Sequence, residues 1–198
     1  MPLTPPSSSS TPSILPAFVQ RLDRRVGRRI NAWPATPHID TVLLRLSTAA
    51  NNGVLWYSVA AGLALTGPRG RRAAARGLVS LGLSSAFANL VAKPVFGGAR
   101  PLAEDVPVAR QLAKFPASAS FPSGHTASAV AFATGAGLES PLAAAVALPL
   151  AAGVAYSRLH VGAHWLSDVA GGAIIGAGMG LASAGVLRLI PGLRRPRR

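Results

Sequence analysis

The chain alternates apolar blocks with short basic clusters, and this alternation limits the folds that are open to it. Hydrophobic residues make up 49% of the 198 positions, whereas charged residues make up only 13%. So few charged side chains cannot cover a water-soluble globule of this size. The arginines gather beside the apolar blocks, within residues 21–29, 69–76 and 188–198. Juxtamembrane basic clusters have this arrangement, so the pattern predicts a membrane protein.

The apolar blocks predict an all-α fold, a polytopic bundle of about five transmembrane helices. They cover approximately residues 49–66, 73–96, 121–138, 141–156 and 165–190. Several are shorter than the roughly 20 residues that cross a bilayer, so some polar residues must lie at the membrane edge. A buried helix of a soluble protein explains one such block, but not five with basic residues between them. The last block also contains small residues suited to close helix packing in lipid, among them Gly171, Gly172, Gly176, Gly178 and Gly180.

The segments outside these blocks differ in composition. Residues 1–15 are rich in proline and serine, and we expect them to be disordered. Residues 16–48 form a basic segment, and we expect its first part to be an amphipathic helix that lies along the lipid headgroups. An ordinary cytosolic amphipathic helix is the alternative. Residues 49–190 then form the membrane domain, and residues 191–198 form a basic tail. The amphipathic pattern rests on four-residue steps between Phe18, Leu22, Val26 and Ile30.

The net charge suits an anionic partner. It is +14, from 20 lysines and arginines against 6 aspartates and glutamates. Nucleic acid and anionic lipid both fit this charge. The chain has no aromatic platform and no recognisable nucleic-acid motif, so we expect a membrane partner and no nucleic acid. The absence of cysteine excludes a disulfide framework and a thiolate metal site.

Residues 121–128, FPSGHTAS, have the composition of an anion-binding helix start. Ser123 can cap a helix, Gly124 leaves room for a ligand, and an apolar run of helical length follows. The unpaired N–H groups of a helix start attract an anion. His125, in the first turn, can transfer a proton to that anion. Taken alone, the stretch is equally well explained as an ordinary turn.

Two more polar clusters stand at the ends of predicted spans. Ionisable residues at membrane depth are costly and indicate a functional site. Lys93, Arg100 and Arg158 are cations, and the arginines suit bidentate contact with phosphate oxygens. His164 and Asp168 are four residues apart, so on a helix they share a face and the carboxylate can orient the imidazole.

With His125 left as the proton donor, this set of residues describes phosphoryl transfer through a phosphohistidine. A zinc site built from His125, His160 and His164 is disfavoured, because the three cations repel a metal and only Asp168 offers a carboxylate there. We therefore expect no metal and no cofactor. His160 has no assigned partner, and is either structural or adjacent to the substrate.

The three clusters resemble the three-part signature of the type-2 phosphatidic acid phosphatase superfamily. Its parts are Lys93, six residues and Arg100-Pro101, then the PSGH of residues 122–125, then Ser157-Arg158, five residues, His164, three residues and Asp168. The superfamily includes lipid phosphate phosphatases, undecaprenyl pyrophosphate phosphatases and vanadium haloperoxidases. The resemblance covers about residues 50–186. LDRR at 22–25, AANNGVLW at 49–56 and SRLHVGAHW at 157–165 are similar to actinobacterial phosphatase domains that are sometimes fused to a diacylglycerol-kinase-like domain.

The resemblance implies a metal-independent, integral-membrane lipid phosphate phosphatase. Its substrates are phosphatidic-acid-like or polyprenyl (pyro)phosphate headgroups, and residues 49–190 are its phosphatase domain. It implies that His164 is the nucleophile, Asp168 its orienting partner and His125 the general acid. It also implies a phosphate-binding set of Lys93, Arg100, Ser123, Gly124 and Arg158. Membrane members commonly have six spans, whereas the apolar blocks here number five beside an interfacial helix.

Two other functions fit parts of the pattern. A vanadate-dependent oxidase uses the same pocket, and a non-catalytic basic membrane protein binds anionic lipid through its arginines alone. Charge also bears on topology. If residues 69–76 and 188–198 face the cytoplasm, the catalytic ends of the spans face outward, although residues 21–29 then lie outside as well. We expect a multi-pass plasma-membrane protein with an extracytoplasmic site; the sequence favours no particular oligomeric state.

Overall fold

The computed structural model describes residues 15–187, and its regular secondary structure in that range is helical. Residues 1–14 of the predicted N-terminal tail (1–15) and the whole predicted C-terminal tail (191–198) lie outside this range. The elements are α1 (Ala17–Ala32), α2 (Pro37–Ala49), α3 (Val54–Ala64), α4 (Pro68–Phe87), α5 (Lys93–Phe96), α6 (Gly124–Gly137), α7 (Pro141–His160) and α8 (Leu166–Leu187). The predicted all-α class is therefore confirmed.

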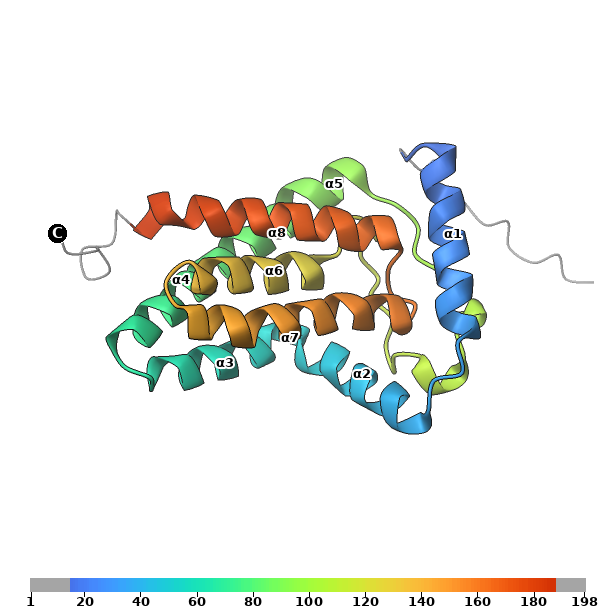
Figure 1. Cartoon of the computed structure of the whole chain (residues 1–198). Helices are drawn as coiled ribbons and strands as arrows, with labels where there is room; N and C mark the ends of the chain where they lie inside the picture. The colour runs from blue at the N-terminus through green and yellow to red at the C-terminus, as the bar shows by residue number, and fades with distance from the viewer. Residues whose placement is uncertain (1–14, 188–198) are drawn as a thin grey trace, which may run out of the picture.

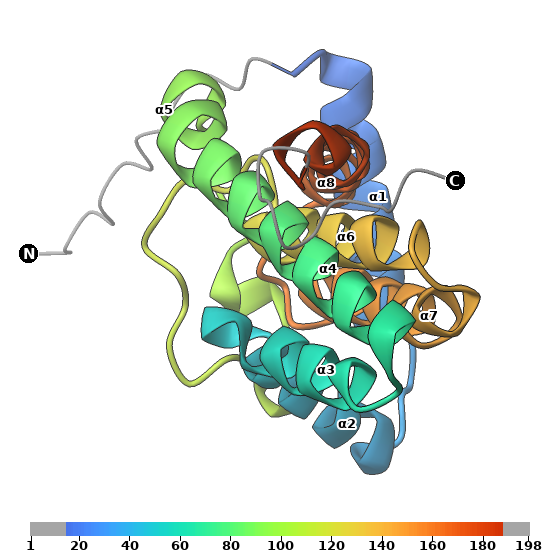
Figure 2. The ribbon, with the colours of Figure 1, turned by 90° about the vertical axis from the view of Figure 1, so that its left-hand side faces the viewer.

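Helix α6 lies at the centre of the bundle, with α4, α7 and α8 around it (Figure 2). The many alanine and glycine residues of α6 allow this central position, because small side chains let neighbouring backbones approach closely. Its buried side chains are mostly alanines, with Phe132 stacking on Trp56 of α3 at 5.0 Å between ring centroids. Gly172, Gly176 and Gly180 of α8 likewise allow a close approach to α6. A Cβ atom at Gly176 would lie 2.4 Å from the carbonyl oxygen of Ala127.

Three helical stretches are long and apolar enough to cross a membrane among the residues described: 68–96, 141–160 and 166–185. The first is one continuous helical path, in which a π-helical turn at Ala88–Ala92 joins α4 to α5. The other two predicted spans correspond to α3 and α6, of 11 and 14 residues. At about 1.5 Å per residue, neither reaches the roughly 30 Å thickness of the hydrocarbon layer. The bundle is thus a membrane fold, and the count of five spans stays a prediction.

The first predicted span does not begin at residue 49, because the chain turns a corner there. Asn52 and Gly53 adopt left-handed backbone angles, with φ of 53° and 77°. Asparagine and glycine tolerate this region better than other residues do. The corner, residues 50–53, ends α2 and lets α3 start in a new direction at Val54. It also brings Asn51 to the end of the bundle where α6 begins.

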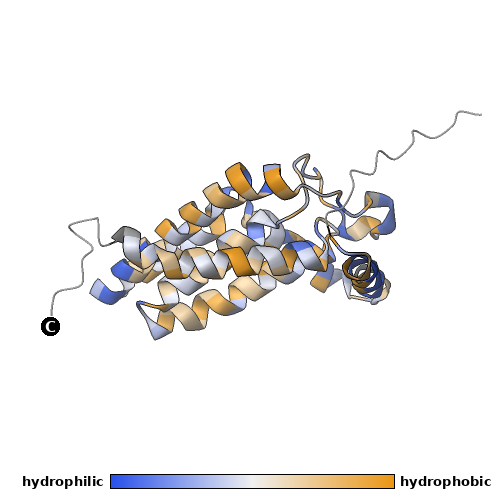
Figure 3. Cartoon of the chain, turned by 90° about the horizontal axis from the view of Figure 1, so that it is seen from above, coloured by the Kyte–Doolittle hydropathy of each residue, from blue (hydrophilic) through white to orange (hydrophobic). Residues whose placement is uncertain are grey.

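Helix α1 runs across the end of the bundle where α8 begins (Figure 1). Polar contacts hold it there: the buried carboxylate of Asp23 accepts hydrogen bonds from the backbone N–H (2.9 Å) and hydroxyl (2.7 Å) of Ser167. At its other end, Arg110 donates to the carbonyl oxygens of Ile30 and Trp33. Helix α1 therefore crosses the end of the bundle, and its predicted position along the lipid headgroups stays a prediction. Figure 3 shows strongly polar residues on α1 and apolar residues along the long helices.

The opposite end of the bundle has its own ion pair. Arg76 of α4 donates to Glu139 at 2.8 Å and to the hydroxyl of Ser183 at 3.1 Å. These contacts join α4, the turn after α6 and α8. The basic cluster at residues 69–76 is therefore at the end of the molecule away from the N-terminus of α6.

Candidate active site

The three predicted polar clusters meet at one end of the bundle. Elements far apart in the chain supply them: the end of the α4–α5 path, the connection after it, the start of α6, the end of α7 and the turn into α8. Lys93, Arg100, Arg158 and His164 all lie within electrostatic reach of His125. A Cβ atom at Gly124 would lie 3.9 Å from Nζ of Lys93, which places that ammonium group at the start of α6.

Asp168 is held by three donors. Its Oδ2 lies 3.3 Å from Nδ1 of His164, and it accepts from the hydroxyl of Ser120 and from the backbone N–H of Trp165 at 2.8 Å. The Trp165 contact is the carboxylate half of a capping box at the start of α8. The predicted His164–Asp168 contact is present, although His164 precedes α8 and does not share a helix face with Asp168. Ser120 and Trp165 thus fix the carboxylate of Asp168 in the position from which it can orient the imidazole of His164.

The other nitrogen of His164 faces Arg100. Nη1 of Arg100 lies 3.2 Å from Nε2 of His164. Because a guanidinium group can only donate, Nε2 must accept, and Nδ1 carries the proton that points to Asp168. Burial lowers the pKa of His164 to about 4, although the hydrogen bond that the ring donates to Asp168 acts to raise it. The ring is therefore neutral near pH 7, with its lone pair on Nε2.

Ser118, just before the FPSGHTAS stretch, binds both Lys93 and Arg100. The hydroxyl of Ser118 accepts from Nζ of Lys93 at 3.0 Å and from Nη2 of Arg100 at 3.3 Å. Arg100 also donates to the carbonyl oxygen of Ser118 at 3.0 Å. Sequence reasoning missed Ser118 and Ser120. The sequence offered one indication that they belong to the site: they lie in the run SAS, residues 118–120, directly before the FPSGHTAS stretch.

Arg158 is buried with unused donors. Its side chain is 1% exposed, and Nη1 donates to the hydroxyl of Ser47 in α2. Within the described part of the chain, its Nε and Nη2 make no hydrogen bond. Buried donors without a partner cost roughly 1–3 kcal/mol each, so such a group normally serves a ligand. An anion with several acceptor oxygens fits these two nitrogens.

The start of α6 is capped as predicted. The hydroxyl of Ser123 accepts from the backbone N–H of Thr126 at 3.4 Å and from its hydroxyl at 3.0 Å. His125 lies in the first turn, and its Nε2 is 2.8 Å from Oδ1 of Asn51. Sequence reasoning did not connect Asn51 with the site. Its position at the entrance of an apolar block was the only indication.

His160 does not join the other two histidines. Its Nε2 lies 2.8 Å from Oδ1 of Asp40, which also accepts from Nε of Arg110 at 2.9 Å. Of the two roles predicted for His160, this contact favours the structural one. Among residues 15–187, no three histidine or carboxylate side chains are placed to hold a metal ion.

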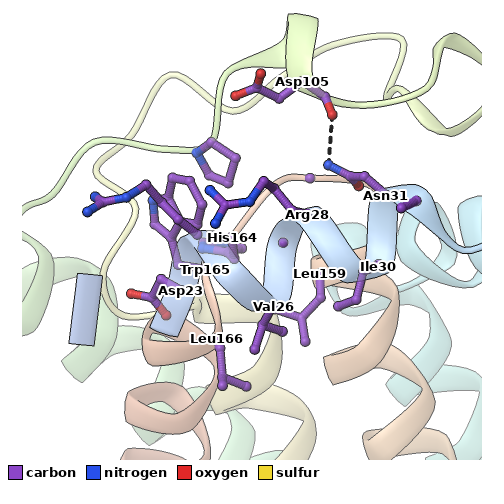
Figure 4. Close-up of a pocket in the computed structure, with 15 residues that line it drawn as sticks. Asp23, Val26, Arg28, Ile30, Asn31, Asp105, Leu159, His164, Trp165 and Leu166 are labelled. Carbon is purple, nitrogen blue, oxygen red and sulfur yellow. Dashed lines mark hydrogen bonds between the residues drawn. The ribbon is translucent and has the colours of Figure 1, made fainter. Parts of the chain in front are cut away.

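Two cavities border the site. One, of about 510 Å³, lies between α1 and the turn from α7 to α8, with His164 and Trp165 in its wall. Figure 4 shows α1 beside it, with the side chain of Asn31 bonded to the carbonyl oxygen of Asp105 at 2.7 Å. The other, of about 790 Å³, is lined by aromatic and aliphatic residues of the α4–α5 path, the following connection and α8, and by polar residues of α1. It has Arg100 and Asp168 in its wall.

Comparisons with known proteins agree with this geometry. The model of the PAP2 superfamily matches residues 74–189. The crystal structure of Aquifex aeolicus LpxE is similar, with a TM-score of 0.65, 27% identity, and coverage of 83% of this chain and 95% of that one. The crystal structure of a transmembrane PAP2 type phosphatidylglycerolphosphate phosphatase from Bacillus subtilis has a TM-score of 0.67 over 91% of this chain and 92% of that one. At 20% identity, the second supports the fold alone.

A search of curated proteins found no match. The family match nevertheless covers more than half of the chain and includes Lys93, Arg100, His125, Arg158, His164 and Asp168. The fold, the membrane-spanning helices and this match together identify a membrane phosphatase that acts on lipids, and the chain belongs to the PAP2 superfamily of type-2 phosphatidic acid phosphatases.

Proposed function

We propose that this protein releases inorganic phosphate from lipid phosphomonoesters or pyrophosphates, of the phosphatidic-acid or polyprenyl class, through a phosphohistidine. The observation that carries the proposal is the state of Arg158: a buried cation with two unused donors, in the same cluster as a neutral, oriented histidine. A phosphate group satisfies these donors and presents its phosphorus to the histidine.

In the first step, Nε2 of His164 attacks phosphorus. The P–N bond forms while the bond from phosphorus to the lipid oxygen breaks, and His125 gives its proton to that oxygen. Asp168 accepts from Nδ1 and stabilises the positive ring. A bound phosphate dianion also favours the protonated form of His125, which the first step requires.

In the second step, a water molecule attacks the phosphohistidine. His125 takes a proton from the water, the new P–O bond forms, and the P–N bond breaks to release phosphate and neutral His164. The net reaction consumes one water and yields the lipid alcohol, or the lipid monophosphate when the substrate is a pyrophosphate.

The cations supply the charge stabilisation for both steps. Lys93, Arg100 and Arg158 bind the non-bridging oxygens, which carry most of the charge in the transition state. The hydroxyl of Ser123 and the backbone N–H of Gly124 add neutral donors at the start of α6. Because cations already occupy this role, we infer that the reaction is independent of metal and that activity survives EDTA.

The larger cavity supports a lipid substrate. It offers about 790 Å³ beside Arg100, between apolar side chains that include Phe96, Phe121 and Ile174. A hydrocarbon chain can therefore leave the phosphate site along these apolar side chains, although Gln20, Asp23 and Arg24 of α1 also line the cavity. The basic cluster 69–76, at the other end of the bundle, supports a site on the outer face of the plasma membrane.

The test is phosphate release by the protein purified in detergent. The panel contains phosphatidic acid, undecaprenyl pyrophosphate and, because one structural relative is named for it, phosphatidylglycerolphosphate. We expect phosphate from at least one lipid, an acid-labile phosphoenzyme, and a loss of at least about 10³-fold in His164→Ala. His38→Ala, which removes an exposed histidine on α2, is the matched control. Phosphate from none of the lipids, or full activity in His164→Ala, contradicts the proposal.

A further inference from the structure

The corner between α2 and α3 lies outside the part of the chain that matches the family, yet it reaches the site. Building on the proposed function, we propose that Asn51 is a positioning residue for His125, and that it makes Nδ1 the nitrogen that transfers the proton to and from the substrate.

The hydrogen bond assigns the two ring nitrogens. Oδ1 of Asn51 lies 2.8 Å from Nε2 of His125. An amide oxygen can only accept, so Nε2 carries a proton whenever this contact is made. The proton that moves during the reaction is then the one on Nδ1.

The backbone holds Asn51 in place independently of the histidine. Asn52 and Gly53 fix the corner with left-handed angles directly after it. Ser47, four residues earlier and fully buried, binds Arg158. The same short segment therefore contacts both the phosphate-binding arginine and the general acid, and it sets their relative positions.

This arrangement suits a group that must give and then take a proton. In the first step, Nδ1–H protonates the lipid oxygen as its bond to phosphorus breaks. In the second, Nδ1 accepts the proton of the attacking water. A neutral amide keeps the ring oriented through both steps. A carboxylate partner would also stabilise the imidazolium, whereas the amide leaves the ring free to lose and regain its proton.

The first experiment compares leaving groups. A good leaving group such as p-nitrophenolate needs little protonation, whereas a lipid alcohol needs it fully. We expect Asn51→Ala to lower kcat on a lipid phosphate by about 10- to 100-fold, the range for a hydrogen bond to a charged group, with a smaller loss on p-nitrophenyl phosphate and little change in KM. The double variant with His125→Ala should be no worse than His125→Ala alone. Thr48→Ala, an exposed neighbour bonded only within its own helix, is the control.

The second experiment uses readouts that a purely structural residue does not change. In Asn51→Asp, the carboxylate favours the imidazolium, so the alkaline limb of the kcat profile, which reports the enzyme with phosphate bound, should move to higher pH. Nitrogen-15 NMR of the histidines, of which the chain has four, should show the Nε2–H tautomer of His125 in the wild type and its loss in Asn51→Ala.

The outcomes separate this inference from the proposed function. Equal losses on both leaving groups, additive losses with His125→Ala, an unmoved alkaline limb in Asn51→Asp, or an unchanged tautomer overturns the role of Asn51. If the wild type is active and the Asn51 variants behave like Thr48→Ala, the inference alone is wrong. If the wild type and Thr48→Ala hydrolyse neither substrate, both proposals fall together.

Discussion

Nη1 of Arg100 lies 3.2 Å from Nε2 of His164, so a cation stands at the nitrogen that we propose attacks phosphorus. The same nitrogen of Arg100 also donates to the carbonyl oxygen of Ala163 at 2.6 Å, which keeps the side chain against the turn. A guanidinium cannot accept a hydrogen bond, so it stabilises the tautomer with a free Nε2 lone pair. An incoming phosphate must take over this contact, and the arginine then holds its oxygen next to the nucleophile.

The pH profile should reveal whether His164 is the nucleophile, as we propose. The pKa of His164 is lowered from 6.5 to about 4 by burial, so the neutral ring persists down to that pH and the nucleophile is lost only below it. We expect the acid limb of kcat/KM, after correction for the ionisation of the substrate, near pH 4 and not near pH 6.5. Asp168→Asn removes a group that raises this pKa, so its residual activity should have an acid limb at still lower pH. A limb that moves upward contradicts this assignment.

Replacing Arg158 should separate stability from activity. Arg158→Met removes a buried cation with unused donors, so we expect a free energy of unfolding higher by about 1–3 kcal/mol and phosphate release lower by at least about 100-fold. Thermal melting in detergent and the phosphate-release assay check the two effects. Inorganic phosphate should raise the melting temperature of the wild type but not that of the variant.

The control for this prediction is Arg45→Met, which removes an exposed arginine on α2. It should change neither the melting temperature nor the activity appreciably. If Arg158→Met melts well below the wild type, the arginine contributes to the fold more than its unused donors cost, and the prediction is wrong.

Two glycines of α8 should respond differently to the same substitution. A Cβ atom at Gly176 would lie 2.4 Å from the carbonyl oxygen of Ala127 in α6, whereas one at Gly178 meets nothing within 4 Å. We expect Gly176→Ala to destabilise the bundle by about 1–3 kcal/mol through overpacking. Gly178→Ala should be neutral or more stable by up to about 1 kcal/mol, because alanine favours a helix. Equal melting temperatures for the two variants are inconsistent with the close approach of α6 and α8.

Asp40 should matter for stability because it pairs two buried groups. Asp40→Ala leaves Arg110, 4% exposed, without its carboxylate, and removes the partner of His160. Breaking a buried pair in this way costs about 3–5 kcal/mol. Thermal melting should show this loss, while Glu104→Ala, which removes an exposed carboxylate, should melt like the wild type. Similar melting of both variants contradicts a structural role for Asp40.

The sequence predicted the membrane class and the family correctly because both depend on local patterns. Apolar blocks of helical length, basic residues beside them and the fixed spacing around His125 and His164 can be recognised without any knowledge of packing. The same patterns gave less accurate boundaries. The helix predicted from residue 49 begins at Val54, because Asn52 and Gly53 adopt left-handed angles that end α2. Asn-Gly is a turn signal, but a block placed by its hydropathy alone runs across it.

The partners of the site residues could not be predicted in the same way. Asn51 and His125 are 74 residues apart, and Ser47 and Arg158 are 111 apart. His160 is adjacent in sequence to the turn that contains His164, yet it bonds to Asp40, 120 residues away. Such contacts depend on where α2 lies against α7, and no periodicity within either helix encodes that placement.

The sequence by itself therefore determined that this chain is a helical membrane protein of the PAP2 superfamily, and it identified the residues that carry the family signature. Only the tertiary structure decided the hydrogen-bond partners of the histidine nitrogens: Nε2 of His164 contacts Arg100, and Nε2 of His125 contacts Asn51. The physical reason is that residue types and spacing specify which groups are present, whereas the tautomer of a histidine follows from the donors and acceptors that packing brings to it.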